Sequence, residues 1–233
     1  MRAITIANAN DADTGFIGDR FREHGYAFDE CHRELPNEWP DLAGHDLVLL
    51  LGSEWSVYWP DIADKVKAEV ALLQEAERRG IPVFGICFGS QVMAHAFGGS
   101  VFKADVAEIG WMDVETDVPD VLAAGPWMEW HYDVVTLPPG ANEMARTEVG
   151  SQAWQRGRMF CTQFHPEVHE AVIRRWATGF GEAELKRIGS SPAELIASTQ
   201  AAVGASSVNA ARLVDWFCDT IVSSRDANVI NRQ

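Results

Sequence analysis

Residues 82–91 read PVFGICFGSQ, an apolar run that ends on a cysteine held between glycines. Its first part, residues 83–86, is a short apolar run of the kind that forms a buried strand in a parallel sheet. Residues 90–97 then have helical spacing, with Val92, Met93 and Ala96 on one side. Cys87 therefore lies at a turn that leads from a strand into a helix.

A strand-to-helix turn of this kind predicts a reactive cysteine. It raises the side chain above the sheet and places it near a helix N-terminus, whose unpaired N–H groups and dipole favour a thiolate. Gly85 and Gly89 flank Cys87 and are expected to let the backbone bend sharply. Because a lone cysteine after an apolar strand is more often a packed thiol, the nucleophile interpretation requires partner residues elsewhere in the chain.

Composition and charge narrow the class of protein. A chain of 233 residues with 47% apolar and 23% charged residues has the balance of an ordinary globular α/β protein. Lys and Arg number 19 against 34 Asp and Glu, and the formal net charge of -15 disfavours nucleic acid and anionic membranes as partners. Four cysteines without paired spacing, no signal peptide and no apolar run of membrane-spanning length predict a cytoplasmic protein with reduced thiols.

The chain before the cysteine strand alternates between strands and helices. Apolar runs predict strands at residues 3–7, 26–31 and 46–51. Helical spacing predicts helices at 16–24 and 62–79, each closed by a glycine. This order predicts a flavodoxin-like α/β fold with a doubly wound, mostly parallel sheet.

The middle of the chain predicts a small antiparallel patch. Turn signals separate short alternating pieces, and the patch is expected to bring residues 127–133 toward the cysteine. The predicted pieces are residues 100–103, 109–114, 134–137, 143–147 and 159–162.

Three extra helical pieces are predicted near the C-terminus. They cover residues 182–188, 192–202 and 208–222, and Ser206 or Ser207 is expected to cap the last one. We therefore expect a main domain at 1–180 and a helical extension at 181–233 that packs on that domain or on a partner.

A base and its orienting group are predicted after the strand at 159–162. His165 and Glu167 are two residues apart, and in an extended segment such residues face the same side. Pro166 keeps the residue before it out of helical geometry. A catalytic cysteine needs such a base, and the base needs a partner that fixes its tautomer. Attack on a carbonyl also needs oxyanion donors, for which we predict the turn at Gly52-Ser53 and the backbone N–H of Phe88.

The segments GICFGSQ at 85–91 and FHPE at 164–167 together resemble the class I (triad) glutamine amidotransferase family. With the Gly52 turn upstream, the resemblance covers most of residues 1–180. It implies that Cys87 is the nucleophile, His165 the general base and acid, and Glu167 the orienting carboxylate.

The resemblance also implies a substrate pocket. Gln91 matches the motif glutamine near that pocket, and His131 with Asp133 matches a His-x-Asp stretch of the family. We predict that the substrate contacts Gly52, Gln91, Trp130 and His131.

The reaction implied by the family is hydrolysis of glutamine. Cys87 attacks the carboxamide carbon to give a γ-glutamyl thioester, ammonia leaves, and His165 activates the water that completes the cycle. In the family the ammonia passes to a synthase domain or subunit, and this chain is too short to contain a recognisable one. No cofactor is implied. A metal site is not expected either, because Pro166 interrupts the only helical histidine spacing, between His165 and His169.

Two positions depart from the family pattern. Members similar to the amidotransferases of anthranilate and guanylate synthases carry Gly-Gly-Pro where this chain has Gly52-Ser53-Glu54, so a Cβ at Ser53 is expected to hinder the oxyanion turn. Trp130 stands before His131 where a small polar residue is common. Nine tryptophans in the chain suggest an aromatic pocket mouth, which would suit a γ-glutamyl substrate with an apolar amine.

Three alternatives to a glutaminase stay open. A γ-glutamyl amide or peptide hydrolase would use the same triad on a larger leaving amine. A non-catalytic regulatory subunit could keep the fold, although an intact triad is not what a decayed site shows. The superfamily of intracellular proteases and deglycases commonly has histidine after the cysteine, where this chain has Phe88.

Overall fold

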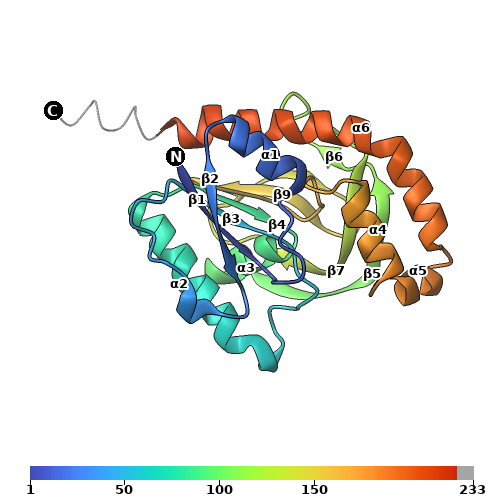
Figure 1. Ribbon diagram of the computed structural model, residues 1–233, viewed down its shortest axis with the longest axis horizontal. Helices are drawn as coiled ribbons and strands as arrows, with labels where there is room; N and C mark the ends of the chain where they lie inside the picture. The colour runs from blue at the N-terminus through green and yellow to red at the C-terminus, as the bar shows by residue number, and fades with distance from the viewer. Residues whose placement is uncertain (225–233) are drawn as a thin grey trace.

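The computed structural model describes residues 1–224 and is built around an eight-stranded sheet of order β2-β1-β3-β4-β10-β9-β8-β6 (Figure 1). The first five strands in that order run parallel to one another. This confirms the predicted flavodoxin-like, mostly parallel sheet. The parallel strands are β1 (Arg2–Ala7), β2 (Ala27–His32), β3 (Leu47–Leu50), β4 (Val83–Ile86) and β10 (Met159–Thr162).

Antiparallel strands extend one edge of this sheet and form a second, smaller one. The edge consists of β9 (Ser151–Arg156), β8 (Asn142–Arg146) and β6 (Glu115–Thr116). The smaller sheet pairs β5 (Ser100–Met112) with β7 (Trp127–Thr136).

Two details of the predicted antiparallel patch were wrong. The pieces at 100–103 and 109–114 belong to the single strand β5, since the irregularity between Lys103 and Glu108 shifts the register without ending the strand. The piece at 159–162 is β10, which lies inside the main sheet between β4, to which it is parallel, and β9, to which it is antiparallel.

Helices cover both faces of the main sheet. They are α1 (Gly15–Glu23), α2 (Ala63–Arg79), α3 (Phe88–Ala96), α4 (Glu170–Thr178), α5 (Glu182–Arg187) and α6 (Pro192–Trp216), with short 3₁₀ turns at Pro36–Glu38 and Pro60–Ile62 and a π-helical turn at Phe217–Val222. The long helix α6 runs along the molecule beside α1 and α4 (Figure 1).

The alternating side chains of β3 show which helices cover each face of the sheet. Leu47 and Leu49 pack in one buried cluster with residues of α1 and α6, and Val48 and Leu50 pack in another with residues of α2 and α3. Successive side chains of a strand point to opposite faces, so an uninterrupted apolar strand requires a helix layer on each side. The carboxyl ends of β3 and β4 carry the turns that form the site.

The helix α6 corrects the predicted boundaries near the C-terminus. It is continuous through Gly204, because its buried face, which includes Ser206 and Ala210, packs along the molecule and outweighs the roughly 1 kcal/mol that a helical glycine costs. Ser206 is buried within the helix and does not cap it. The cap is Ser191, whose hydroxyl accepts a hydrogen bond from the Glu194 N–H at 3.3 Å. Within residues 1–224, no helix is both long and apolar enough to cross a lipid bilayer.

Candidate active site

The turn after β4 places Cys87 in a strained conformation. Its φ of 51° and ψ of -105° make it the one non-glycine residue among 1–224 with positive φ. Residues held in such sparsely populated regions cluster at active sites, and a nucleophile at a strand-to-helix elbow is the recurring example. Cys87 is the residue immediately before α3, its side chain makes no capping hydrogen bond, and its backbone N–H donates to the Thr162 carbonyl at 2.8 Å.

Gly85 and Gly89, on either side of Cys87, are needed for close packing and not for a bend in the backbone. Neither Gly85 nor Gly89 has positive φ, so the expectation that they supply the sharp bend was wrong. A Cβ at Gly85 would lie 2.5 Å from the Met93 sulfur, and one at Gly89 would lie 2.6 Å from the Leu50 carbonyl oxygen. These glycines let α3 approach β3 and β4 closely, while the strain falls on Cys87.

His165 and Glu167 form a buried pair beside Cys87. The His165 Nδ1 lies 2.8 Å from Glu167 Oε1, and the His165 N–H donates to the Met128 carbonyl at 2.8 Å, which fixes the extended segment. Burial alone lowers the pKa of His165. The charges of Glu167 and Cys87, with their hydrogen bonds to the ring, outweigh burial and hold that pKa well above its usual value. An imidazolium can therefore stand next to the cysteine at neutral pH.

One pocket collects most of the predicted site residues. Phe88 is fully buried and does not line it, in keeping with a role predicted only for its backbone N–H. The predicted residues that line the pocket are Gly52, Ser53, Cys87, Gln91, Trp130, His131, His165 and Glu167.

The aromatic pocket mouth suggested by the sequence includes two residues that the sequence did not assign to it, Trp176 and Phe180. Trp176 of α4 meets the His165 ring edge to face with centroids 4.9 Å apart, and its Nε1–H donates to Asp11 at 2.8 Å. Trp55 and Phe180 also line the pocket, and Trp130 packs against both Trp176 and Phe180. Nothing in the local sequence of α4 shows that this helix faces the cysteine.

The turn after β3 faces Cys87 across the pocket. A Cβ at Gly52 would lie 2.9 Å from the Cε1 atom of His165 and 3.5 Å from the Cβ of Cys87, so glycine is required at this position by space. Ser53 has no positive φ, and its hydroxyl accepts a hydrogen bond from the Trp55 N–H at 3.2 Å. The hindrance that a Cβ at Ser53 would cause if this turn had to change its conformation stays a prediction.

Three backbone N–H groups in the turns after β3 and β4 have no hydrogen-bond acceptor among residues 1–224. Those of Gly52, Ser53 and Phe88 donate no hydrogen bond to any residue in the described part of the chain. Phe88 is the first residue of α3, where a helix leaves its N–H groups unpaired. Donors aimed at the site where negative charge develops are the largest single source of stabilisation in acyl transfer.

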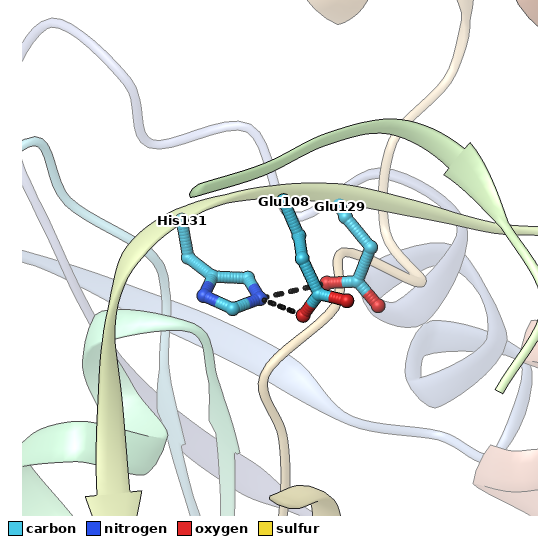
Figure 2. Close-up of side chains that lie close together, drawn as sticks. All are labelled: Glu108, Glu129 and His131. Carbon is cyan, nitrogen blue, oxygen red and sulfur yellow. Dashed lines mark ion pairs between the residues drawn. The ribbon is translucent and has the colours of Figure 1, made fainter. Parts of the chain in front are cut away.

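A buried ionic cluster lies behind the pocket and joins β5 to β7. Figure 2 shows the carboxylates of Glu108 and Glu129 converging on one ring nitrogen of His131. The His131 Nε2 is 3.0 Å from Glu108 and 3.3 Å from Glu129, and Nδ1 donates to the Asp133 carbonyl at 3.0 Å. Glu108 also accepts a hydrogen bond from Gln152 at 2.7 Å.

Protonation of His131 and Glu129 reduces the net negative charge of this buried cluster. Burial lowers the pKa of His131, but the hydrogen bonds to Glu108 and Glu129 outweigh it and raise that pKa to about 10. Burial raises the pKa of Glu129, which favours its neutral form. The ligand atoms of these three residues lie within 4.8 Å of one another, close enough to hold a small cation, which would have to displace the proton from Nε2. Both ring nitrogens of His131 already have hydrogen-bond or ion-pair partners. Its predicted contact with a substrate would therefore be made by the carbon atoms of the ring.

The chain is similar in sequence to known proteins. The family model described as glutamine amidotransferase class-I matches residues 38–174. A GMP synthase (glutamine-hydrolyzing) from Aeropyrum pernix is 35% identical over 181 residues, which are 71% of this chain and 33% of that protein. The corresponding protein of Limosilactobacillus reuteri is 36% identical over 146 residues, which are 56% of this chain and 27% of its own. The chain thus spans about a third of the length of these relatives.

A solved structure of a glutamine amidotransferase superposes on nearly the whole of this chain. The crystal structure of a glutamine amidotransferase from Thermotoga maritima is 28% identical, superposes with a TM-score of 0.82, and covers 94% of this chain and 99% of its own. The region matched by the family model, residues 38–174, contains the elbow, the facing turn and the His165 segment. The chain belongs to the class-I glutamine amidotransferase family.

Proposed function

We propose that this protein hydrolyses the carboxamide of glutamine through a γ-glutamyl thioester on Cys87. The observation that carries the proposal is the strained Cys87 elbow, which shares one pocket with the hydrogen-bonded pair His165 and Glu167. A nucleophile, a base and an orienter within one pocket are the parts that covalent acyl transfer needs.

The first half of the cycle forms the thioester. The Cys87 thiolate attacks the carboxamide carbon, and the carbonyl electrons move onto oxygen, where the N–H groups of Phe88 and the Gly52-Ser53 turn would stabilise the charge. When the tetrahedral intermediate collapses, the C–N bond breaks and the imidazolium of His165 gives its proton to the departing nitrogen. Ammonia leaves, and the γ-glutamyl group remains on sulfur.

The second half releases glutamate. Neutral His165 now takes a proton from water, the resulting hydroxide attacks the thioester carbon, and the C–S bond breaks to restore the thiolate and the imidazolium. Because Nδ1 of His165 is bonded to Glu167, Nε2 is the nitrogen that carries both proton transfers. Neither half requires a cofactor.

The fate of the ammonia belongs to the same proposal. Amidotransferases pass it to a synthase, and the Aeropyrum and Limosilactobacillus relatives are named GMP synthases. We propose a separate synthase subunit as the acceptor for this chain. The four cysteines form no disulfide, which suits the cytoplasm as the place of action.

The aromatic wall favours a second candidate, a γ-glutamyl amide hydrolase. Trp55, Trp130, Trp176 and Phe180 line the pocket together with the carboxylates of Asp11, Asp13, Glu54 and Asp133, and no Lys or Arg of the described chain lines it. Aromatic faces and carboxylates favour an apolar or cationic amine as the leaving group. The triad chemistry would be unchanged.

Substrate preference tests the two candidates. The protein would be incubated with glutamine and, separately, with γ-glutamyl amides of aliphatic, aromatic and cationic amines, and the released glutamate would be measured. Cys87→Ala serves as the control. Glutaminase activity predicts the highest kcat/KM for glutamine, whereas a preference of about tenfold or more for a bulky amide would establish the hydrolase. If no electrophilic glutamine analogue labels Cys87, a non-catalytic subunit becomes the better interpretation.

A further inference from the structure

Arg33, the first residue after β2, is completely buried beneath the turn that faces Cys87. Its Nε donates to Glu69 at 2.6 Å, and the same guanidinium donates to the carbonyl oxygens of Leu51 and Gly52, each at 3.0 Å. The side-chain oxygen of Asn8 accepts a further bond at 2.9 Å. A guanidinium is a planar fork of donors, so it can hold two consecutive carbonyls at once.

These two bonds determine which way the neighbouring N–H groups point. In a trans peptide the C=O and the N–H of one plane point in opposite directions. The Leu51 carbonyl shares its plane with the Gly52 N–H, and the Gly52 carbonyl shares its plane with the Ser53 N–H. Since both carbonyls are turned to Arg33, both N–H groups are turned away from it, on the side where residues 51–53 line the pocket with Cys87.

Arg33 also contacts the other side of the oxyanion site. Its guanidinium carbon lies 4.7 Å from the centre of the Phe88 ring, within the range of a cation–π contact. Phe88 follows the nucleophile and supplies the opposing N–H donor. One buried side chain therefore touches both halves of the site while remaining outside the pocket.

We propose that Arg33 is a positioning residue for the oxyanion hole. It holds the carbonyls of Leu51 and Gly52 inward, keeps the N–H groups of Gly52 and Ser53 directed at Cys87, and braces Phe88, while Glu69 anchors its charge. The role rests on the proposed acyl-transfer function, because it matters only when an oxyanion forms.

The test removes both members of the buried pair. In the double variant Arg33→Met/Glu69→Leu no buried charge is left without a partner, and apolar replacements of similar volume are commonly tolerated in such pairs. We expect a folded protein with a lowered midpoint of thermal unfolding, because the carbonyls of Leu51 and Gly52 lose their donor. We expect kcat to fall by about 10²–10³-fold, as for the loss of an oxyanion donor, with KM nearly unchanged. Alkylation of Cys87 by iodoacetamide should keep its rate and pH profile, since displacement of iodide creates no oxyanion.

Two further variants keep the test decisive. Arg33→Lys retains a charge for Glu69 but lacks the fork, so it should lose an intermediate part of kcat even if the double variant does not fold. Arg20→Met/Asp215→Leu is the matched control, because it removes the ion pair that links α1 to α6 at 2.7 Å and touches no pocket residue. It should leave kcat unchanged.

Several results would overturn the inference. The first is a folded double variant with wild-type kcat. The second is a fall in the alkylation rate of Cys87 that parallels the fall in kcat, because it would show that the variant changes the reactivity of the thiol and not the oxyanion hole. A crystal structure of the double variant gives a readout independent of turnover, namely the orientation of the Gly52–Ser53 peptide. If the wild type hydrolysed no γ-glutamyl amide, the proposed function would fail, yet this peptide would still show whether Arg33 orients the turn.

Discussion

The two sides of the active site are built in different ways. The Cys87 side, which carries the proposed nucleophile, lies within ten consecutive residues, and its geometry is stored locally as the strained φ of 51° at Cys87. The facing side, Gly52 and Ser53, shows no positive φ and is instead held through hydrogen bonds from Arg33, 19 residues away in the chain. One side carries its own strain, and the other depends on a distant, buried ion pair.

The two halves should therefore be sensitive to substitutions at different places in the chain. The elbow is stabilised by close packing of α3 on β3 and β4, so changes within residues 85–89 should act on it directly. The facing turn should respond to changes at Arg33 and Glu69, which never touch the pocket. Mutations on the two sides therefore test whether the elbow and the facing turn depend on different residues.

The largest effect is expected for Cys87→Gly. Activity should fall by about 10⁶-fold because the nucleophile is lost. Stability should exceed that of Cys87→Ala by about 1 kcal/mol, because only glycine adopts positive φ without steric cost. Turnover assays and urea unfolding of both variants measure this. Equal stabilities would mean that the elbow stores no strain, and the contrast between the two sides would disappear.

The next effect concerns the facing turn. Gly52→Ala should lower kcat by about 10²-fold, because its Cβ would come 2.9 Å from the Cε1 atom of His165 and displace the base. Ser53→Gly is the matched control and should change kcat by no more than about twofold, since Ser53 has no positive φ for glycine to relieve. Steady-state kinetics of both variants decide the matter. A large gain for Ser53→Gly would show that the serine does restrain the turn.

These two sides also explain what could be predicted from the sequence. The sheet, the elbow and the pair His165 and Glu167 were predictable because each depends on local patterns, namely apolar period, flanking glycines and a two-residue spacing. Arg33 and Trp176 were not, because nothing in their local sequence shows which distant backbone they will meet. The continuity of α6 through Gly204 was missed for the same reason, since tertiary packing outweighed the local preference.

A third prediction extends the comparison to the buried cluster of Glu108, Glu129 and His131. The folded-state pKa of His131 is about 10, above its unfolded value, so its contribution to stability is complete below about pH 6.5 and is lost as pH rises toward 10. The loss should be on the order of 3 kcal/mol, measured by urea unfolding between pH 6.5 and 10. His131→Gln should flatten that profile. An unchanged profile would show that another group causes the pH dependence.

The smallest effect is expected far from the pocket, at the start of α6. Ser191→Ala should destabilise the protein by about 1 kcal/mol, because the Glu194 N–H would lose the hydroxyl that caps it. Ser207→Ala is the matched control, since its exposed hydroxyl only bonds back to the Gly204 carbonyl and caps nothing. Kcat should stay unchanged in both variants, because neither serine lines the pocket. If Ser191→Ala lowered kcat instead, α6 would take part in shaping the pocket, and the dependence on distant residues would extend beyond Arg33 to the C-terminal helix.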